Sequence, residues 1–134
     1  MEQVKIKILT TQAVDGEKET IRTKTTGTLE TTPDAYILRY EQVVPEEAPL
    51  PTILTVDKAA TKAVMEHRGI ITIEPGVTHT APYRMGPYEM ELSVTGKTLL
   101  CRLTPKGGNL KFCYELAMNG TPAGETTVEL FVES

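Results

Sequence analysis

Apolar and polar residues alternate along most of this chain. The alternation is clearest over residues 88–95, where apolar side chains occupy only the even positions. A period of two is typical of a β-strand with one buried face, because successive side chains point to opposite sides of a sheet. The pattern recurs along the sequence and predicts ten strands, near residues 3–12, 18–31, 35–44, 51–57, 60–67, 70–74, 87–95, 98–104, 109–118 and 124–133.

Turn-forming residues separate these segments. Examples are Asp15-Gly16, Pro75-Gly76, Gly96-Lys97 and Gly107-Gly108, residue types that favour turns. Short antiparallel strands in sequence order favour an all-β fold, in which residues 1–134 form a single domain. We expect a closed antiparallel up-and-down β-barrel of about eight to ten strands, since closure removes exposed strand edges.

One hairpin needs more than a simple turn. A strict two-residue turn at Asn119-Gly120 would bring a charged side chain opposite a buried one. Pairing Phe112 with Val128 instead keeps apolar residues on one face, but it requires a loop of odd length near Gly120 or a β-bulge beside it. We therefore expect one of these two irregularities.

Composition and charge exclude several classes of partner. The formal net charge is −4, and basic pairs such as Lys5/Lys7 and Arg22/Lys24 are read as solvated strand faces. This balance disfavours nucleic acid, which requires clustered cations. No apolar run is long enough to span a membrane, and the N-terminus has no secretory signal. The expectations are therefore no nucleic acid, no membrane, and a cytoplasmic location.

The sequence contains no recognisable catalytic constellation. The chain has two histidines and two cysteines, but no closely spaced metal-ligand pair and no nucleophile motif. Glu89 and Glu91 alternate with apolar residues and fit the solvent face of a strand. We therefore predict no catalytic residue, metal or cofactor, which favours a non-enzymatic role.

Several polar residues fall on faces that should point inward. Thr23 and Thr25 share a face with apolar neighbours and with Gly27. In a packed core such residues need hydrogen-bond partners, whereas in a cavity they could meet water or a ligand. The alternative is that the strand bends or bulges near Gly27. Tyrosines on the apolar faces of other strands could point into the same lumen, or their hydroxyls could reach only the rim: Tyr36, Tyr40, Tyr88 and Tyr114.

Two longer loops are expected. Residues 45–51 carry three prolines and should cross one end of the barrel. Residues 75–87 mix aromatic, cationic and conformationally special residues, including His79, and long loops at a barrel mouth often carry function. Arg68 and His79 are the polar groups expected at the mouth, although a salt bridge with a nearby glutamate is the alternative for Arg68.

The order of several short motifs resembles the YwiB-like family of small bacterial proteins of unknown function. The resemblance runs from Val4 to Val132 and rests on these motifs: Asp15-Gly16-Glu17, Gly27-Thr28-Leu29, Tyr40-Glu41, Arg68-Gly69, Gly76 with His79, Met85-Gly86, Met90-Glu91-Leu92 and residues 108–116. It implies a calycin-like or lipocalin-like barrel in the cytoplasm. It implies no activity and no catalytic residue.

Two functional hypotheses remain open. The first is a non-enzymatic barrel that binds a small, partly apolar ligand, with Tyr36, Tyr40 and Tyr88 in the wall, Thr23 and Thr25 in the lumen, and Arg68 and His79 at the mouth. The second is a protein-interaction or structural module with a packed interior. It would act through its outer surface, the 45–51 loop or a homodimer. Apolar residues at outward-facing positions motivate it: Leu9, Ile37, Val43, Ile53 and Phe131.

Overall fold

The computed structural model describes residues 1–42, 48 and 50–134. Ten β-strands form the fold, and no helix occurs among these residues; accordingly no helix there could cross a membrane. Most of the segment 45–51 lies outside the described residues, so the expectation for that loop stays a prediction. The strands are β1 (Glu2–Val14), β2 (Glu17–Thr31), β3 (Ala35–Gln42), β4 (Leu50–Asp57), β5 (Ala63–Glu66), β6 (Ile70–Ile73), β7 (Thr78–Met85), β8 (Tyr88–Thr104), β9 (Gly107–Met118) and β10 (Thr121–Glu133).

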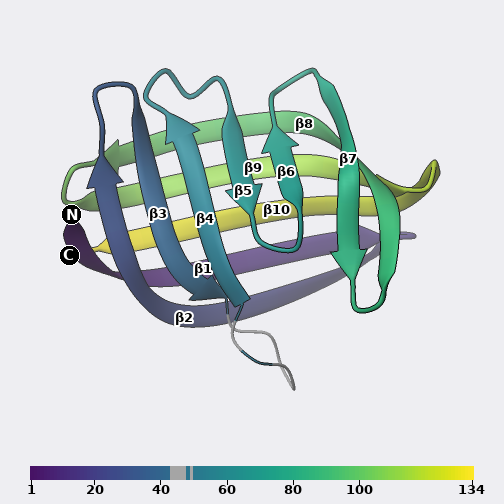
Figure 1. The fold of residues 1–134 in the computed structure, drawn as a ribbon, viewed down its shortest axis with the longest axis horizontal. Helices are drawn as coiled ribbons and strands as arrows, with labels where there is room; N and C mark the ends of the chain where they lie inside the picture. The colour runs from purple at the N-terminus through teal and green to yellow at the C-terminus, as the bar shows by residue number, and fades with distance from the viewer. Residues whose placement is uncertain (43–47, 49) are drawn as a thin grey trace.

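All ten strands belong to one antiparallel sheet in the order β6-β5-β4-β3-β2-β1-β10-β9-β8-β7. Every neighbouring pair is consecutive in sequence except β1 with β10, which joins the two ends of the chain. The sheet curls so that β3 to β7 cross over β8, β9, β10 and β1 (Figure 1). The long β2 bends at one side and belongs to both layers (Figure 1). The prediction of an all-β antiparallel barrel is confirmed, and the arrangement is consistent with a calycin-like fold.

The barrel is nearly closed rather than fully closed. Strands β6 and β7 stand at the two ends of the sheet order, and isolated bridges at Gly69–Tyr83 and Pro75–Gly96 span the gap. At the second bridge, the Gly76 amide donates to the Gly96 carbonyl at 2.9 Å and the Gly96 amide donates to the Val77 carbonyl at 3.1 Å. These irregular bonds, rather than a continuous ladder, form the seam.

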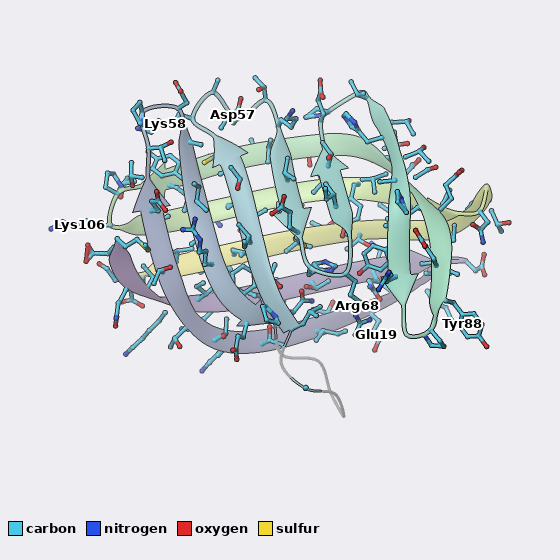
Figure 2. The ribbon with its side chains drawn as sticks, in the orientation of Figure 1. Glu19, Asp57, Lys58, Arg68, Tyr88 and Lys106 are labelled. Atoms are coloured by element: carbon cyan, nitrogen blue, oxygen red, sulfur yellow. The ribbon has the colours of Figure 1, made fainter. Side chains whose placement is uncertain are left out.

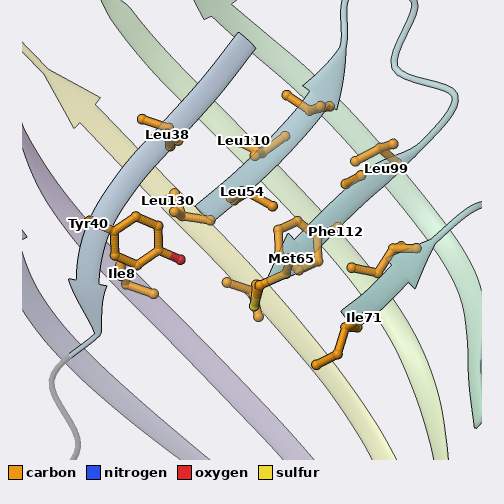
Figure 3. Packing of buried hydrophobic residues seen from close by; sticks show 14 of the residues in the cluster. Ile8, Leu38, Tyr40, Leu54, Met65, Ile71, Leu99, Leu110, Phe112 and Leu130 are labelled. Carbon is orange, nitrogen blue, oxygen red and sulfur yellow. The ribbon is translucent and has the colours of Figure 1, made fainter. Parts of the chain in front are cut away.

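The apolar alternation forms one core between the two layers. The residues at its centre are almost completely buried and come from both layers (Figure 3). They include Ile6, Leu38, Leu54, Leu110, Phe112 and Leu130. Burial of apolar area at roughly 25 cal/mol per Å² is the main force that holds such a sheet curled.

The predicted loop 75–87 contains a strand. In β7, His79, Ala81 and Tyr83 are half-buried, while Thr80 and Pro82 between them are exposed. This is again a period of two, and the proline is tolerated because β7 lies at the end of the sheet order. The loop expectation was therefore wrong.

The predicted strands 87–95 and 98–104 are one strand, β8. The expected turn at Gly96-Lys97 is a bulge: Gly96 pairs with Tyr114 and Thr98 pairs with Cys113, so Lys97 has no partner in the ladder. Its ammonium group instead lies 2.9 Å from Glu115 and 3.0 Å from Glu125. The bulge lets one strand continue through a sharp bend.

Of the two hairpins near the C-terminus, one was predicted wrongly and the other correctly. The β8–β9 turn lies at Pro105-Lys106, since Thr104 pairs with Gly107. The predicted turn at Gly107-Gly108 was wrong, because those glycines belong to β9. In the β9–β10 hairpin Phe112 does pair with Val128, and a register shift between Pro122 and Gly124 makes this possible. The predicted irregularity is confirmed as a bulge.

Candidate functional site inside the barrel

A cavity of about 230 Å³ lies inside the barrel. Inward-facing side chains of both layers surround it, so it is a product of the curled sheet and not of one loop. Its lining residues are Ile8, Thr10, Gln12, Tyr40, Gln42, Met65, His67, Arg68, Ile71, Tyr83, Leu92, Tyr114, Leu116, Met118, Thr126 and Val128. The barrel interior is therefore packed along part of its length and hollow along the rest.

Tyr40 is the most deeply placed polar group facing the cavity. The side chain is only 6% exposed, and its ring packs near Ile8 with the hydroxyl turned into the barrel (Figure 3). No described residue forms a hydrogen bond with that hydroxyl, although buried tyrosines usually find a partner. Burial, together with the neighbouring Tyr114, raises the pKa of Tyr40 well above its ordinary value. The group is therefore a neutral hydrogen-bond donor without an acceptor.

Tyr114 lies on the same wall but has a partner. Burial raises the pKa of this phenol to about 12, an effect strengthened by the nearby Tyr83 and opposed by a hydrogen bond with Thr126. Thr126 is itself buried. The Tyr114 and Thr126 hydroxyls thus share a hydrogen bond, which distinguishes Tyr114 from Tyr40.

His67, Arg68 and Tyr83 form a polar cluster on another part of the cavity wall. His67 Nδ1 accepts the Arg68 backbone amide at 2.8 Å and lies 3.1 Å from the Tyr83 hydroxyl. Because Nδ1 already accepts an N–H, the tyrosine must donate and the ring proton must be on Nε2. The two rings meet edge to face at 5.6 Å between centroids.

The charge state of this cluster follows from its surroundings. Burial, and then the positive charge of Arg68, lower the pKa of His67 below its usual 6.5. Burial raises the pKa of Tyr83, while Arg68 opposes that shift. Both side chains are therefore neutral at pH 7. No aspartate or glutamate is among the described residues that line the cavity.

Two of the seven sequence-predicted site residues line this cavity. They are Tyr40 and Arg68; Arg68 lies beside the turn that joins β5 to β6 (Figure 2). Thr23 and Thr25 pair with Ile8 and Ile6 and so share their face, but both are half-exposed. Thr25 also donates to the Glu41 carbonyl at 2.9 Å.

The other three predicted residues lie elsewhere. Tyr36 packs against the core, with the Lys58 ammonium 5.4 Å from its ring centroid. The Nε2 atom of His79 is 3.0 Å from a Glu74 carboxylate oxygen. Tyr88 is 72% exposed and lies at the tip of the β7–β8 hairpin (Figure 2). None of the three lines the cavity.

Sequence reasoning missed His67, Tyr83 and Thr126. The sequence contained a signal for each of them, because each occupies a position that faces the core in the alternation of its strand. His67 follows Ala63 and Met65 at spacings of two, and Thr126 precedes Val128 in the same way. A polar residue in phase with buried apolar ones is the signal that would have identified them. No group of three metal-ligating side chains occurs in the described part of the chain.

Comparison with known proteins identifies the family of this chain and a similar crystal structure. Residues 6–130 match the family described as "Domain of unknown function (DUF1934)", and no curated protein matches the chain. The crystal structure of the ywiB protein from Bacillus subtilis has the same fold, with a TM-score of 0.87 at 18% identity, covering 99% of this chain and 92% of that one. At that identity the likeness concerns the fold alone. By the extent of its family match, the chain belongs to the DUF1934 family.

Proposed function

We propose that the barrel binds one small, partly apolar ligand in its interior cavity. The observation that carries this proposal is Tyr40, a nearly fully buried tyrosine that faces the cavity with no hydrogen-bond partner among the described residues. No fully buried side-chain nitrogen or oxygen among the described residues lacks a hydrogen-bond partner, so the unpartnered Tyr40 hydroxyl is open to the cavity rather than sealed in the core. A ligand acceptor would give this hydroxyl a partner inside the barrel, so the cavity favours a molecule that accepts a hydrogen bond at this point.

The volume limits the size of the ligand. A cavity of about 230 Å³ corresponds to about eight water molecules at roughly 30 Å³ each. An apolar cavity of about 150 Å³ is large enough for benzene. The ligand class is therefore a single ring, or an acyl chain of similar size, that bears one or two polar substituents.

The lining predicts how such a ligand would be oriented. Its apolar part would lie against Ile8, Met65 and Val128, and one acceptor atom would meet the Tyr40 hydroxyl. A second polar substituent would lie toward His67, whose Nε2–H is the ring's remaining donor once Nδ1 is occupied. This is the usual division of a ligand pocket into apolar walls and a few fixed polar groups.

Thermal unfolding with a panel of single-ring probes tests the proposal. Benzamide, acetophenone and benzoate carry an acceptor, and toluene is the matched probe without one. We expect the acceptor-bearing probes to raise Tm more than toluene, because a ligand that binds only the folded state at 100 times its Kd adds about 2.7 kcal/mol of stability.

Tyrosine-to-phenylalanine variants identify the site in the same assay. Tyr40→Phe should abolish the advantage of the acceptor-bearing probes, while Tyr88→Phe, at an exposed site outside the cavity, should keep it. A panel in which no probe raises Tm at millimolar concentration would contradict the proposal, as would an equal response of the parent protein and the Tyr40→Phe variant.

A further inference from the structure

Part of β2 is an open sheet edge. Residues 17–26 pair with β1 on one side, whereas β3 pairs only with Gly27–Thr31. Within the described part of the chain, no strand lies on the other side of residues 17–26. The open stretch runs along the lower margin of the molecule in the view of Figure 1, below β1. An exposed edge is a template for another strand.

The outer face of this edge is basic. Lys18, Arg22 and Lys24 alternate along it, and Lys7 of β1 is directly opposite Lys24. Lys7, Arg22 and Lys24 have no carboxylate of a described residue within 4.0 Å. Like charges directly opposite each other destabilise a strand pair. The sequence suggested scattered cations, but the strand register brings two separate basic pairs together.

Apolar surface accompanies these charges. A shallow hollow of about 400 Å³ is lined by Lys7, Leu9, Arg22, Lys24 and Phe131, among others, and Phe131 is 44% exposed. On the opposite face of the edge, Ile21 is 38% exposed. The outer face of the edge thus carries Lys18, Arg22 and Lys24, whereas the opposite face carries Ile21 together with Glu17 and Glu19.

We propose that residues 17–26 bind an extended acidic peptide segment of a partner protein, which adds as a strand to the free edge of β2. Backbone hydrogen bonds would supply affinity, as in other cases of strand addition. Specificity would come from acidic side chains opposite Arg22 and Lys24, with an apolar side chain between them facing Ile21 and Thr23. Opposite charges paired across strands stabilise such a contact.

A second copy of this chain does not fit the edge. In a two-fold symmetric antiparallel pair, outer-face side chains of one copy stand opposite outer-face side chains of the other. In every such register centred on one of residues 20–24, like charges meet. Either two of Lys18, Arg22 and Lys24 stand directly opposite each other, or one of them stands opposite its own copy. Like-charge contact disfavours this pairing, so charge complementarity favours an acidic partner.

The test uses the full chain labelled with ¹⁵N and a ten-residue peptide in which glutamate alternates with valine. The control peptide has lysine in place of glutamate. We expect the acidic peptide to shift the amide signals of residues 17–26 and to slow their hydrogen exchange. The double variant R22E/K24E should weaken binding at least tenfold, and K106E, in the β8–β9 turn outside the edge (Figure 2), should change it less than twofold. K24E alone provides a second variant if the double variant unfolds.

Either of two binding results would overturn the proposal: the lysine peptide binds as tightly as the acidic peptide, or R22E/K24E binds the acidic peptide with unchanged affinity. It would also be overturned if the peptide shifted signals only in another part of the sheet, or if the protein formed concentration-dependent dimers through this edge. A single-stranded oligonucleotide that displaces the acidic peptide, and shifts Lys7 and Lys24 without protecting the β2 amides, would assign the surface to nucleic acid instead.

Discussion

Tyr40 and Tyr114 lie close together in the barrel but differ in whether their hydroxyls have partners. Removing a hydroxyl without a partner should cost little, so we expect Tyr40→Phe to leave the free energy of unfolding unchanged or raise it by up to about 1 kcal/mol. Tyr114→Phe loses the hydrogen bond with Thr126 and should lower it by about 1 kcal/mol. Urea denaturation measures both. A Tyr40→Phe variant less stable than Tyr114→Phe would show that the Tyr40 hydroxyl is satisfied within the protein.

His67 should make stability depend on pH. Its pKa is lowered in the folded protein, so the unfolded chain binds the proton more readily. The stabilising contribution is therefore complete above pH 6.5 and is lost as the pH falls through 6.5 toward the folded pKa. His67→Asn, whose Oδ1 can replace Nδ1 as an acceptor, should remove this part of the slope between pH 7 and pH 5.

The matched control is His79→Asn, which keeps His67 and should keep its slope. Free energies of unfolding at pH 5, 6 and 7 decide the matter. Identical pH profiles for the parent and His67→Asn would contradict the assignment of a buried neutral imidazole.

At the residue scale, the sequence predicted part of the candidate site. Tyr40 was identified because it lies on the apolar face of its strand, and Arg68 because it lies next to a turn. Tyr88 has the same parity as buried residues of β8 but lies beyond the end of the core. Alternation along a strand predicts which face of the sheet a side chain lies on. Only the tertiary structure shows how far along the strand the core extends.

The like-charge pair of Lys7 and Lys24 predicts an effect at the element scale. K24E would place a carboxylate opposite Lys7, and we expect it to raise the free energy of unfolding by about 0.2–1 kcal/mol. Lys18 is opposite Ala13, so K18E serves as the control and should have a smaller effect. Thermal unfolding at low salt measures both. If K24E were destabilising, the charges of these two strands would not be in contact.

Errors at the element scale have particular causes. β7 was missed because Pro82 and Gly86 outweighed the alternation of His79, Ala81 and Tyr83. The β8–β9 turn was misplaced because consecutive glycines favour a hairpin turn. Gly107 and Gly108 instead adopt φ values of 130° and 138° inside β9. A Cβ on Gly108 would lie 2.1 Å from the Arg102 carbonyl oxygen, so a close approach explains this glycine.

At the scale of the whole molecule, Gly96 tests how the barrel closes. A Cβ at this position would lie 2.4 Å from the Glu74 carbonyl oxygen, across the seam. Gly96→Ala must therefore push the seam apart, and we expect a loss of about 1–3 kcal/mol in the free energy of unfolding. Thr98→Ala, two residues away at an exposed site, should cost about 0.5 kcal/mol or less. Equal losses for the two variants would mean that the seam contributes little.

The overall architecture was the most predictable property. Antiparallel order and a single core follow from period-two burial and turn spacing, whereas the predicted number of strands agrees only because the missed β7 offsets the division of β8 into two. The expected closed barrel also implies the pairing of β1 with β10, but the gap between β6 and β7 was not predicted, because contacts between distant segments leave no local pattern. The same applies to the cavity, whose walls come from strands throughout the chain.

The central claim is that the barrel interior is open to a small ligand. The methionine methyl groups report on it directly, because Met65 and Met118 line the cavity whereas Met1 and Met90 do not. In the ¹³C spectrum of methyl-labelled protein, benzamide should shift the signals of Met65 and Met118 and leave those of Met1 and Met90 in place. The Tyr40→Phe variant should need a higher probe concentration for the same shift. An unmoved Met65 signal at saturating probe, or equal shifts at all four methyl groups, would contradict the claim.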